Sequence, residues 1–520
     1  MAIESSPDTG GATARHLRGS SLLLAGRLVA LVVDFAAHVL AVRYLSKGDY
    51  GAYTYALAVA TLLSATLLLG LPETIARYAP IFLERKQAGR LVGALAVAAG
   101  LVTGGGLLCI AAVLLLQDPI AEGMNSALAA ELLAILIIVV PTEGLNLIFQ
   151  SLFAALGRVR SIFIRQYVLV PGLRLAAALV LVVGENDVEV LAVGYVFASL
   201  TGLAWYSSLA APAFRTQLRE RFREVEFPAR EVLSFALPVF LTNIFWIVLL
   251  AFSTIALGLL SSTREVAEFQ AVLPPARLNY LAMAIFGILY IPTVARLYAR
   301  NDMDELRHTY LTTTYWLIVL TVPVLALTTV FSPVFVPTFF GSEYESSVGT
   351  LALLAAGYYV HTAAGPNSAT LKVFRKLRYT VVIDLTALAA GIVLNLILIP
   401  IAGAFGAGLA FLLAIAARNV PYQWALKRVT GINLVNRDFI RLQGAVVTVL
   451  GLLAAVEALF DPFLAFAVVL AAVGGGLVLV ACRDMLHLED AFPELAGGPL
   501  GALVRVSEGR RARRGDEGKR

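Results

Sequence analysis

The run LVGALAVAAGLVTGGGLLCIAAVLLL at residues 91–116 decides the fold of this chain. It contains no charged residue and is longer than the about 20 residues that an α-helix needs to cross about 30 Å of hydrocarbon. Arg90 directly precedes the run, and Asp118 follows it after a single residue. A charge-free run of this length predicts a transmembrane helix with a basic end and an acidic end.

Similar apolar stretches recur along the whole chain. Of the 520 residues, 59% are hydrophobic and only 14% are charged, and the mean hydropathy is +0.82. Such a composition does not fit a water-soluble protein. We therefore expect an all-α polytopic membrane protein of about 14 transmembrane helices. The other thirteen stretches are 20–43, 52–76, 127–155, 164–184, 189–211, 232–260, 267–295, 311–332, 349–371, 380–400, 404–426, 442–460 and 463–482.

The basic residues alternate between the two sides of these predicted helices. With a cytoplasmic N-terminus, only Arg43, Lys47 and Arg264 of the forty Lys and Arg fall outside, and three lie within spans, which leaves 34 inside. This asymmetry obeys the positive-inside rule. It predicts cytoplasmic N- and C-termini in the cell membrane. Because the positive charge is spread over many short segments, we expect contact with anionic membrane lipid and no nucleic acid.

Short sequence matches indicate an internal repeat. Thr74-Ile75-Ala76-Arg77 corresponds to Thr293-Val294-Ala295-Arg296 at an offset of 219, and Arg158-Val159-Arg160 corresponds to Lys376-Leu377-Arg378 at an offset of 218. Two homologous halves of six helices, followed by two extra helices, account for these matches. The predicted organisation is a cytoplasmic segment at 1–19, a first six-helix bundle at 20–211, a basic linker at 212–231, a second bundle at 232–426, helices 13 and 14 at 427–484, and a disordered cytoplasmic tail at 485–520.

The chain offers few signals of catalysis. Both cysteines, Cys109 and Cys482, lie in apolar stretches, and the glycine-rich stretches are not followed by the Lys-Ser/Thr pair of a phosphate-binding loop. Zinc-binding and nucleophile-elbow motifs are also missing. We expect a protein that is not an enzyme and that has no cofactor and no metal site.

Charged residues inside the predicted helices are the candidate functional residues, because a charge within the bilayer is costly unless it is paired or hydrated. Arg27 and Asp34 are seven residues apart and should share one helix face. Glu143 and Arg174 lie 15 and 16 residues from Arg158, so we expect them to pair at similar depth on adjacent antiparallel helices. In the second half, Pro274 and Pro275 precede Arg277 and predict a bend beside a cavity wall.

Three residues are candidates for ion coupling. Asp34 and Glu143 are carboxylates in apolar helices, and His361 has a side chain that titrates near neutrality. A hydrogen-bonding role is the alternative for His361, and ion pairing is the alternative for both acids. We expect Asp384 to neutralise the basic segment 372–378.

Four strings resemble polysaccharide-biosynthesis flippases, the O-antigen flippase-like branch of the multidrug/oligosaccharidyl-lipid/polysaccharide (MOP) exporter superfamily. They are RYLSKGDYGAYTYALAVATLLSATLLLGLPETIAR at 43–77, FFGSEYESSVGTLALLAAGYYV from Phe339, GPNSATLKVFRKLR from Gly365 and LNLILIPIAGAFGAGLAFLLA from Leu394. The resemblance implies a fourteen-helix transporter that moves a polyprenyl- or dolichyl-phosphate-linked oligosaccharide from the inner to the outer leaflet, alongside glycan-assembly enzymes. It also implies a cationic central cavity, for which Arg27, Arg277 and Arg174 are the candidate substrate-binding residues.

Three other functions remain open at this point. A MATE-like multidrug exporter would share the fold, but three arginines against two acids within the helices favour an anionic cargo. A membrane glycosyltransferase, polymerase or ligase belongs to a different class and generally needs a large outer loop. The longest predicted outer segment, 332–348, is short. A scaffold or a lipid scramblase would not require charges inside the membrane.

Overall fold

The computed structural model describes residues 9–184, 187–221 and 225–486, and every regular element in these ranges is a helix. The chain divides into two compact units, residues 1–271 and 272–520, and the boundary falls inside α12. The first unit contains α1 (Thr9–Tyr44), α2 (Lys47–Leu68), α3 (Leu71–Glu84), α4 (Ala88–Leu115), α5 (Gln117–Met124), α6 (Ala127–Leu136), α7 (Val139–Ala155), α8 (Val159–Phe163), η1 (Ile164–Leu169), α9 (Val170–Val183), α10 (Val188–Arg221), α11 (Ala229–Leu260) and the start of α12 (Thr263–Arg277).

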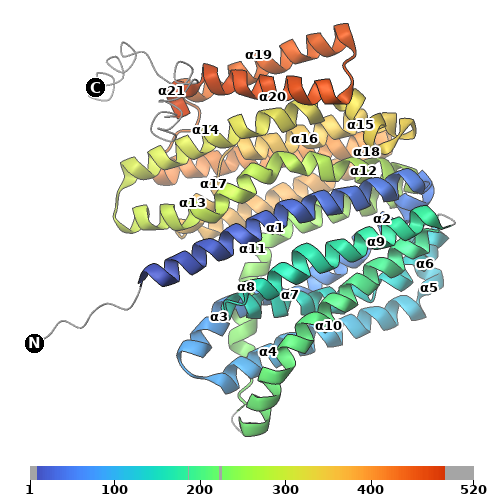
Figure 1. The fold of residues 1–520 in the computed structure, drawn as a ribbon, viewed down its shortest axis with the longest axis vertical. Helices are drawn as coiled ribbons and strands as arrows, with labels where there is room; N and C mark the ends of the chain where they lie inside the picture. Colours follow the sequence, from blue (N-terminus) through green and yellow to red (C-terminus); the bar gives the residue numbers. More distant parts are fainter. Residues whose placement is uncertain (1–8, 185–186, 222–224, 487–520) are drawn as a thin grey trace, which may run out of the picture. The chain divides into compact units, whose positions relative to one another are not determined.

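The first unit is held together by apolar side chains from helices that are distant in sequence. Leu71 and Ile75 of α3 belong to the same buried cluster as Leu95 of α4, Ile148 of α7 and Val232 of α11. On the other side of the unit, α9 packs mainly against α1 and α10, and these helices run side by side in Figure 1. α11 therefore packs with the first six predicted spans, although it follows the predicted linker.

Several predicted spans are interrupted helices. The span 52–76 breaks between α2 and α3, where Leu69 and Gly70 have φ values of 45° and 76°. The left-handed conformation at these residues ends α2 and re-aims the chain into α3. The span 164–184 begins with η1, a π-helix, before it continues as α9.

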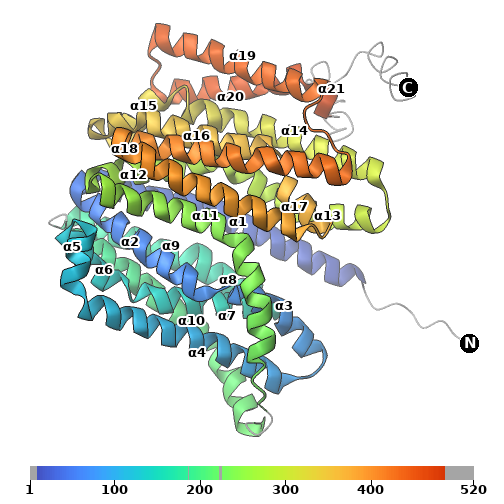
Figure 2. The same ribbon diagram turned by 180° about the vertical axis from the view of Figure 1, so that it is seen from behind.

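The second unit continues from α12 with a further series of helices. They are η3 (Leu278–Tyr280), α13 (Leu281–Ala299), α14 (Met303–Thr328), α15 (Ser332–Phe340), η4 (Ser342–Ser347), α16 (Val348–Ala363), α17 (Asn367–Val373), α18 (Leu377–Thr430), α19 (Arg437–Phe460), α20 (Leu464–Ala481) and α21 (Arg483–Leu486). Within this unit α14 packs against both α16 and α20, and α19 lies along α20 (Figure 2).

The 54-residue α18 is a hairpin of two helices. Arg418 and Asp384 are 34 residues apart, which a straight helix would separate by about 50 Å, yet their side chains are 2.8 Å apart. The reversal occurs at Ala402 and Gly403, whose φ/ψ values are not helical. This confirms that the predicted spans 380–400 and 404–426 are separate helices.

The predicted fold class, an all-α polytopic membrane protein, is confirmed. Among the described residues, nine helices are long and apolar enough to cross a membrane, or ten if the bent α12–α13 pair is one span. This count takes α18 as one helix, although its chain crosses twice if both halves of its hairpin are spans. Residues 1–8 and 487–520 lie outside the described ranges. The count of fourteen spans, the two six-helix bundles and the disordered tail stay predictions.

Candidate functional site

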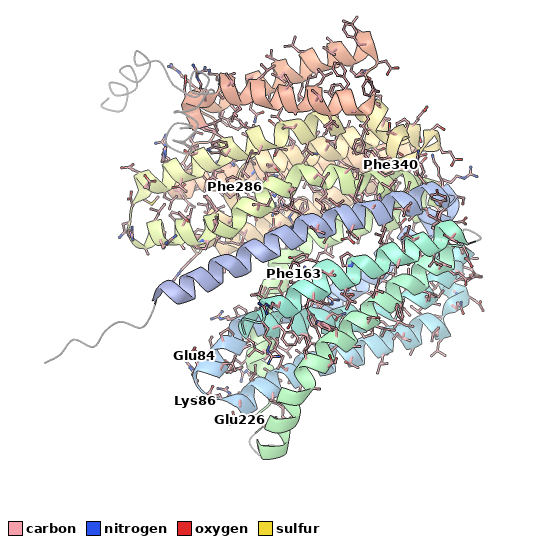
Figure 3. All side chains as sticks on the ribbon, viewed as in Figure 1. Glu84, Lys86, Phe163, Glu226, Phe286 and Phe340 are labelled. Atoms are coloured by element: carbon pink, nitrogen blue, oxygen red, sulfur yellow. The ribbon has the colours of Figure 1, made fainter. Side chains whose placement is uncertain are left out.

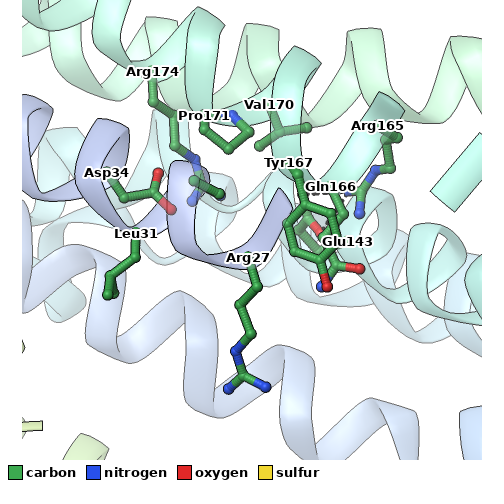
Figure 4. A pocket seen from close by; sticks show the side chains of 11 residues that line it. Arg27, Leu31, Asp34, Glu143, Arg165, Gln166, Tyr167, Val170, Pro171 and Arg174 are labelled. Atoms are coloured by element: carbon green, nitrogen blue, oxygen red, sulfur yellow. Dashed lines mark hydrogen bonds and ion pairs between the residues drawn. The ribbon is translucent and has the colours of Figure 1, made fainter. Parts of the chain in front are cut away.

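A cavity of about 470 Å³ lies within the first unit, between α1, α7, η1 and α9. Its wall combines apolar side chains with five charged ones, and Figure 4 shows these side chains on the helices that surround the cavity. The lining residues are Arg27, Ala30, Leu31, Asp34, Glu143, Arg165, Gln166, Tyr167, Val170, Pro171 and Arg174. The sequence-predicted residues Arg27, Asp34, Glu143 and Arg174 are thus brought together.

One face of α1 supplies Arg27 and Asp34 to this cavity, as their seven-residue spacing predicts. α1 comes close to the neighbouring helix because residue 26 is glycine. A Cβ atom at Gly26 would lie 2.5 Å from the ring of Phe163, which is labelled in Figure 3. The missing side chain therefore lets α1 close one wall of the cavity.

The π-helix η1 places three consecutive side chains, Arg165, Gln166 and Tyr167, on the cavity wall. The Val170 N–H donates to the Arg165 carbonyl five residues earlier, which is the π-helical pattern. Pro171 follows directly and has no N–H to donate to residue 167. The π-turn therefore coincides with the part of the chain that lines the cavity.

Glu143 pairs with Arg165 and not with Arg174, which corrects the predicted ion pair. The Arg165 Nη2 donates to both carboxylate oxygens of Glu143, at 3.1 and 3.0 Å. The prediction assumed that consecutive helices are neighbours, whereas α9 packs mainly against α1 and α10. It also assumed a regular α-helix after Arg158, whereas residues 164–169 form the π-turn.

Arg174 projects from α9 toward Asp34 of α1 in Figure 4. Its guanidinium carbon lies 4.2 Å from the ring centroid of Tyr195, a cation–π contact with α10. Among the described residues, the buried Nε of Arg174 has no hydrogen-bond partner. The cavity therefore carries three guanidinium groups and two carboxylates, and it holds donor capacity that the protein does not use.

Sequence reasoning missed Arg165 as a cavity residue. It follows Arg158 and Arg160 closely and was therefore counted among the cytoplasmic basic residues. In the structure Arg165 is only 5% exposed, and its guanidinium lies over the ring of Tyr206 at 5.3 Å. The polar pair Gln166-Tyr167 beside it, within an apolar stretch, was the available signal.

Two other predicted site residues belong to the second unit. Arg277 ends α12 after Pro274 and Pro275, and its side chain is exposed. His361 of α16 is buried, stacks on Tyr280 and lies 3.2 Å from the Asn419 side-chain oxygen. These contacts give His361 a hydrogen-bonding environment, and its predicted role in coupling stays untested.

Asp384 pairs directly with Arg418, a partner that the sequence did not indicate, and its charge also acts on Lys372 of the basic segment 372–378. Arg418 Nε donates to Asp384 at 2.8 Å, and the Tyr422 hydroxyl donates to the same oxygen at 3.0 Å. Because α18 folds back on itself, it carries both partners. Arg418 was missed as a partner because the sequence places it at the cytoplasmic end of the next span.

No group of metal-ligating side chains occurs in the part of the chain that the structure describes. The candidate site is a cavity of about 470 Å³ lined by three arginines, two carboxylates and apolar side chains.

A family model described as "Polysaccharide biosynthesis protein" matches residues 16–298. No curated protein sequence matches the chain significantly. Among solved structures, the lipid II flippase MurJ in an inward closed conformation is similar, with a TM-score of 0.67 and 14% identity over 92% of this chain and 99% of that one.

Two further solved structures share the fold. An inward-facing multidrug resistance MATE family transporter of the MOP superfamily gives a TM-score of 0.60 at 15% identity, covering 78% of this chain and 94% of that one. A MOP superfamily transporter from Pyrococcus furiosus, described as having a binding pocket of reverse polarity, gives 0.53 at 16% identity, covering 80% and 96%. The chain has the fold of MOP superfamily transporters.

Proposed function

The chain belongs to the polysaccharide biosynthesis protein family, and from this premise we propose that it is a flippase for polyprenyl-phosphate- or diphosphate-linked oligosaccharide. The observation that carries the proposal is the cavity of the first unit, in which Arg27, Arg165 and Arg174 outnumber two carboxylates. An excess of guanidinium groups within apolar helices is suited to an anionic group and unsuited to a cationic drug.

In this proposal Arg27 and Arg174 bind the phosphate groups of the lipid carrier. Guanidinium groups donate two parallel hydrogen bonds to phosphate oxygens, and Arg174 has a donor that the protein leaves unused. The cavity, at about 470 Å³, lies within the range of about 300–1,000 Å³ that is usual for small-molecule sites. It accommodates a diphosphate and part of the first sugar, while the lipid tail stays in the bilayer.

Transport follows by alternating access between the two halves, from the inner to the outer leaflet. Arg277 is the proposed contribution of the second half to phosphate binding, and Asp34, Glu143 and His361 are the proposed ion-coupling residues. We further propose the cell membrane as the location, with both termini in the cytoplasm, and glycan-assembly enzymes as partners. A phosphate-linked glycan made at the inner face is the cargo that these features suit.

The test is reconstitution of the protein in liposomes with a fluorescent polyprenyl-diphosphate-linked oligosaccharide. Hydrogen bonds to charged groups contribute about 1.5–3 kcal/mol each, so Arg27→Ala and Arg174→Ala should each slow translocation about 10- to 100-fold at low substrate concentration. Arg296→Ala removes an exposed arginine outside the cavity and is the matched control. Unchanged translocation in the Arg27→Ala/Arg174→Ala double variant would exclude this cavity as the substrate site.

The same liposomes can distinguish a flippase for lipid-linked oligosaccharide from a multidrug exporter. Transport of a cationic dye, without any movement of the lipid-linked oligosaccharide, would indicate a multidrug exporter instead.

A further inference from the structure

We propose that Arg165 is paired with Glu143 in the empty cavity and with a substrate phosphate in the loaded cavity. We further propose that Glu143 takes up one proton when the phosphate replaces it as the partner of Arg165. This inference rests on the proposed function, because it requires a phosphate-bearing substrate. Both carboxylate oxygens of Glu143 accept from the Arg165 Nη2, at 3.1 and 3.0 Å. A phosphate presents a similar pair of oxygens to a guanidinium group.

The two partners differ in how firmly they are held. The Arg165 side chain is 6% exposed, and the Glu143 side chain is 21% exposed on the cavity wall. Arg165 is backed by α10, where Tyr206 lies under its guanidinium and Gly202 leaves room for its Nε. The carboxylate is therefore the partner that can yield, and Arg165 is fixed in position to receive another anion.

The charged residues that line the cavity in the first unit, taken by themselves, favour the uptake of a compensating proton. Three arginines and two carboxylates give the empty cavity a net charge of +1. A diphosphate diester carries one negative charge on each phosphate, so the loaded cavity would have a net charge of −1. An uncompensated charge among apolar helices is costly. A proton from water that binds a carboxylate oxygen of Glu143 makes the loaded cavity neutral and leaves the Arg165 Nη2 free to donate to phosphate.

Glu143 and Asp34 are the two carboxylates of the cavity, so Asp34 is the alternative site for the proton. The geometry favours Glu143, because its protonation releases a guanidinium group that is already in place. The charged and titratable groups that face Glu143 are Arg165 and Tyr167 of η1, Tyr206 of α10, Arg174 of α9, and Arg27 and Asp34 of α1.

The experiment measures ligand binding and proton uptake by the full-length protein in lipid nanodiscs. The probe is farnesyl-diphosphate-linked N-acetylglucosamine, a diester whose diphosphate does not titrate near neutrality. If one proton is taken up with each ligand, the Kd of the wild type should rise with pH, by up to about tenfold per pH unit. A pH-sensitive dye in weakly buffered solution should report about one proton taken up per ligand bound.

Glu143→Gln keeps the size of the side chain and an oxygen that accepts from Arg165. We expect this variant to bind the probe at every pH at least as tightly as the wild type does at its acidic limit, and to take up no proton. The matched control is Glu122→Gln, which neutralises an exposed carboxylate of the same unit outside the cavity and should keep the pH dependence of the wild type. Thermal melting of both variants verifies that they are folded.

Four outcomes would overturn the inference. If Asp34→Asn abolishes the pH dependence and Glu143→Gln keeps it, the proton binds Asp34. Weaker binding by Glu143→Gln at every pH would indicate that Glu143 only supports the structure. Binding by the wild type without any pH dependence would remove proton uptake but leave the proposed function standing, whereas no binding at all would contradict both.

Discussion

Asp384 and Arg418 form an ion pair whose side chains are 1% and 6% exposed. Removal of one partner of such a pair leaves a buried charge without compensation, which costs about 3–5 kcal/mol. Asp384→Ala should therefore strongly lower the thermal stability of the purified protein in detergent, and it also deprives the Tyr422 hydroxyl of its acceptor. Replacement of both charges, in Asp384→Leu/Arg418→Met, should recover most of the lost stability.

The control for this prediction is Glu345→Ala, which removes an exposed carboxylate in η4. An exposed substitution of this kind changes stability by about 0.5 kcal/mol or less. Equal melting temperatures for Asp384→Ala and Glu345→Ala would show that the buried pair contributes nothing to stability.

Sequence reasoning about single residues succeeded where it depended on spacing within one regular helix. Arg27 and Asp34 lie on one face because α1 is continuous between them. It failed for Glu143 and Asp384, whose partners depend on which helices become neighbours. A long side chain such as Arg165 or Arg418 looks cytoplasmic near the end of an apolar stretch, and only the packed structure shows that it turns inward.

At the scale of elements, α2 meets the start of α12 in a contact that tolerates no side chain. A Cβ atom at Gly51 would lie 1.7 Å from the backbone oxygen of Thr263. Beside this contact, Lys47 Nζ of α2 and Glu268 of α12 pair at 2.7 Å. Because backbone cannot give way as a side chain can, we expect Gly51→Ala to lower stability by about 1–3 kcal/mol.

Gly48→Ala is the matched control on the same helix, one turn earlier. Its Cβ would meet only the Ser46 Oγ at 3.7 Å, an ordinary contact. Alanine is a better helix former than glycine by about 1 kcal/mol, so Gly48→Ala should be neutral or stabilising in thermal melts. A Gly51→Ala protein as stable as Gly48→Ala would show that α2 and α12 do not approach as closely as described.

Apolar length predicted two helices within α18, because the apolar region 380–426 is about twice as long as one membrane span requires. It did not predict the break at Leu69 and Gly70, since both residues are compatible with an apolar run. It also missed the π-turn of η1, which depends on a local hydrogen-bond pattern and on Pro171. Apolar length thus predicts where helices are, while their interruptions depend on backbone conformation, which hydropathy does not measure.

At the scale of the whole molecule, the sidedness of the chain rests on the distribution of charge. The asymmetry of 34 basic residues against three predicts which loops face the cytoplasm. Any missed or additional span would exchange the sides of every later loop. Two loops on the same side of the membrane must be separated by an even number of spans, and two loops on opposite sides by an odd number. Labelling the loops from one side therefore tests the predicted number of spans between them.

We predict that single cysteines at Glu122 and Glu345 react with a membrane-impermeant maleimide in intact cells, and that cysteines at Arg85 and Asp304 react only after lysis. All four side chains are exposed, and the native Cys109 and Cys482 are first replaced by alanine. Six predicted spans separate residue 122 from residue 345, so the two must label from the same side. Labelling of the Glu345→Cys variant only after lysis would show an odd number of crossings between them, and would contradict both the fourteen-span topology and the equal orientation of the two halves.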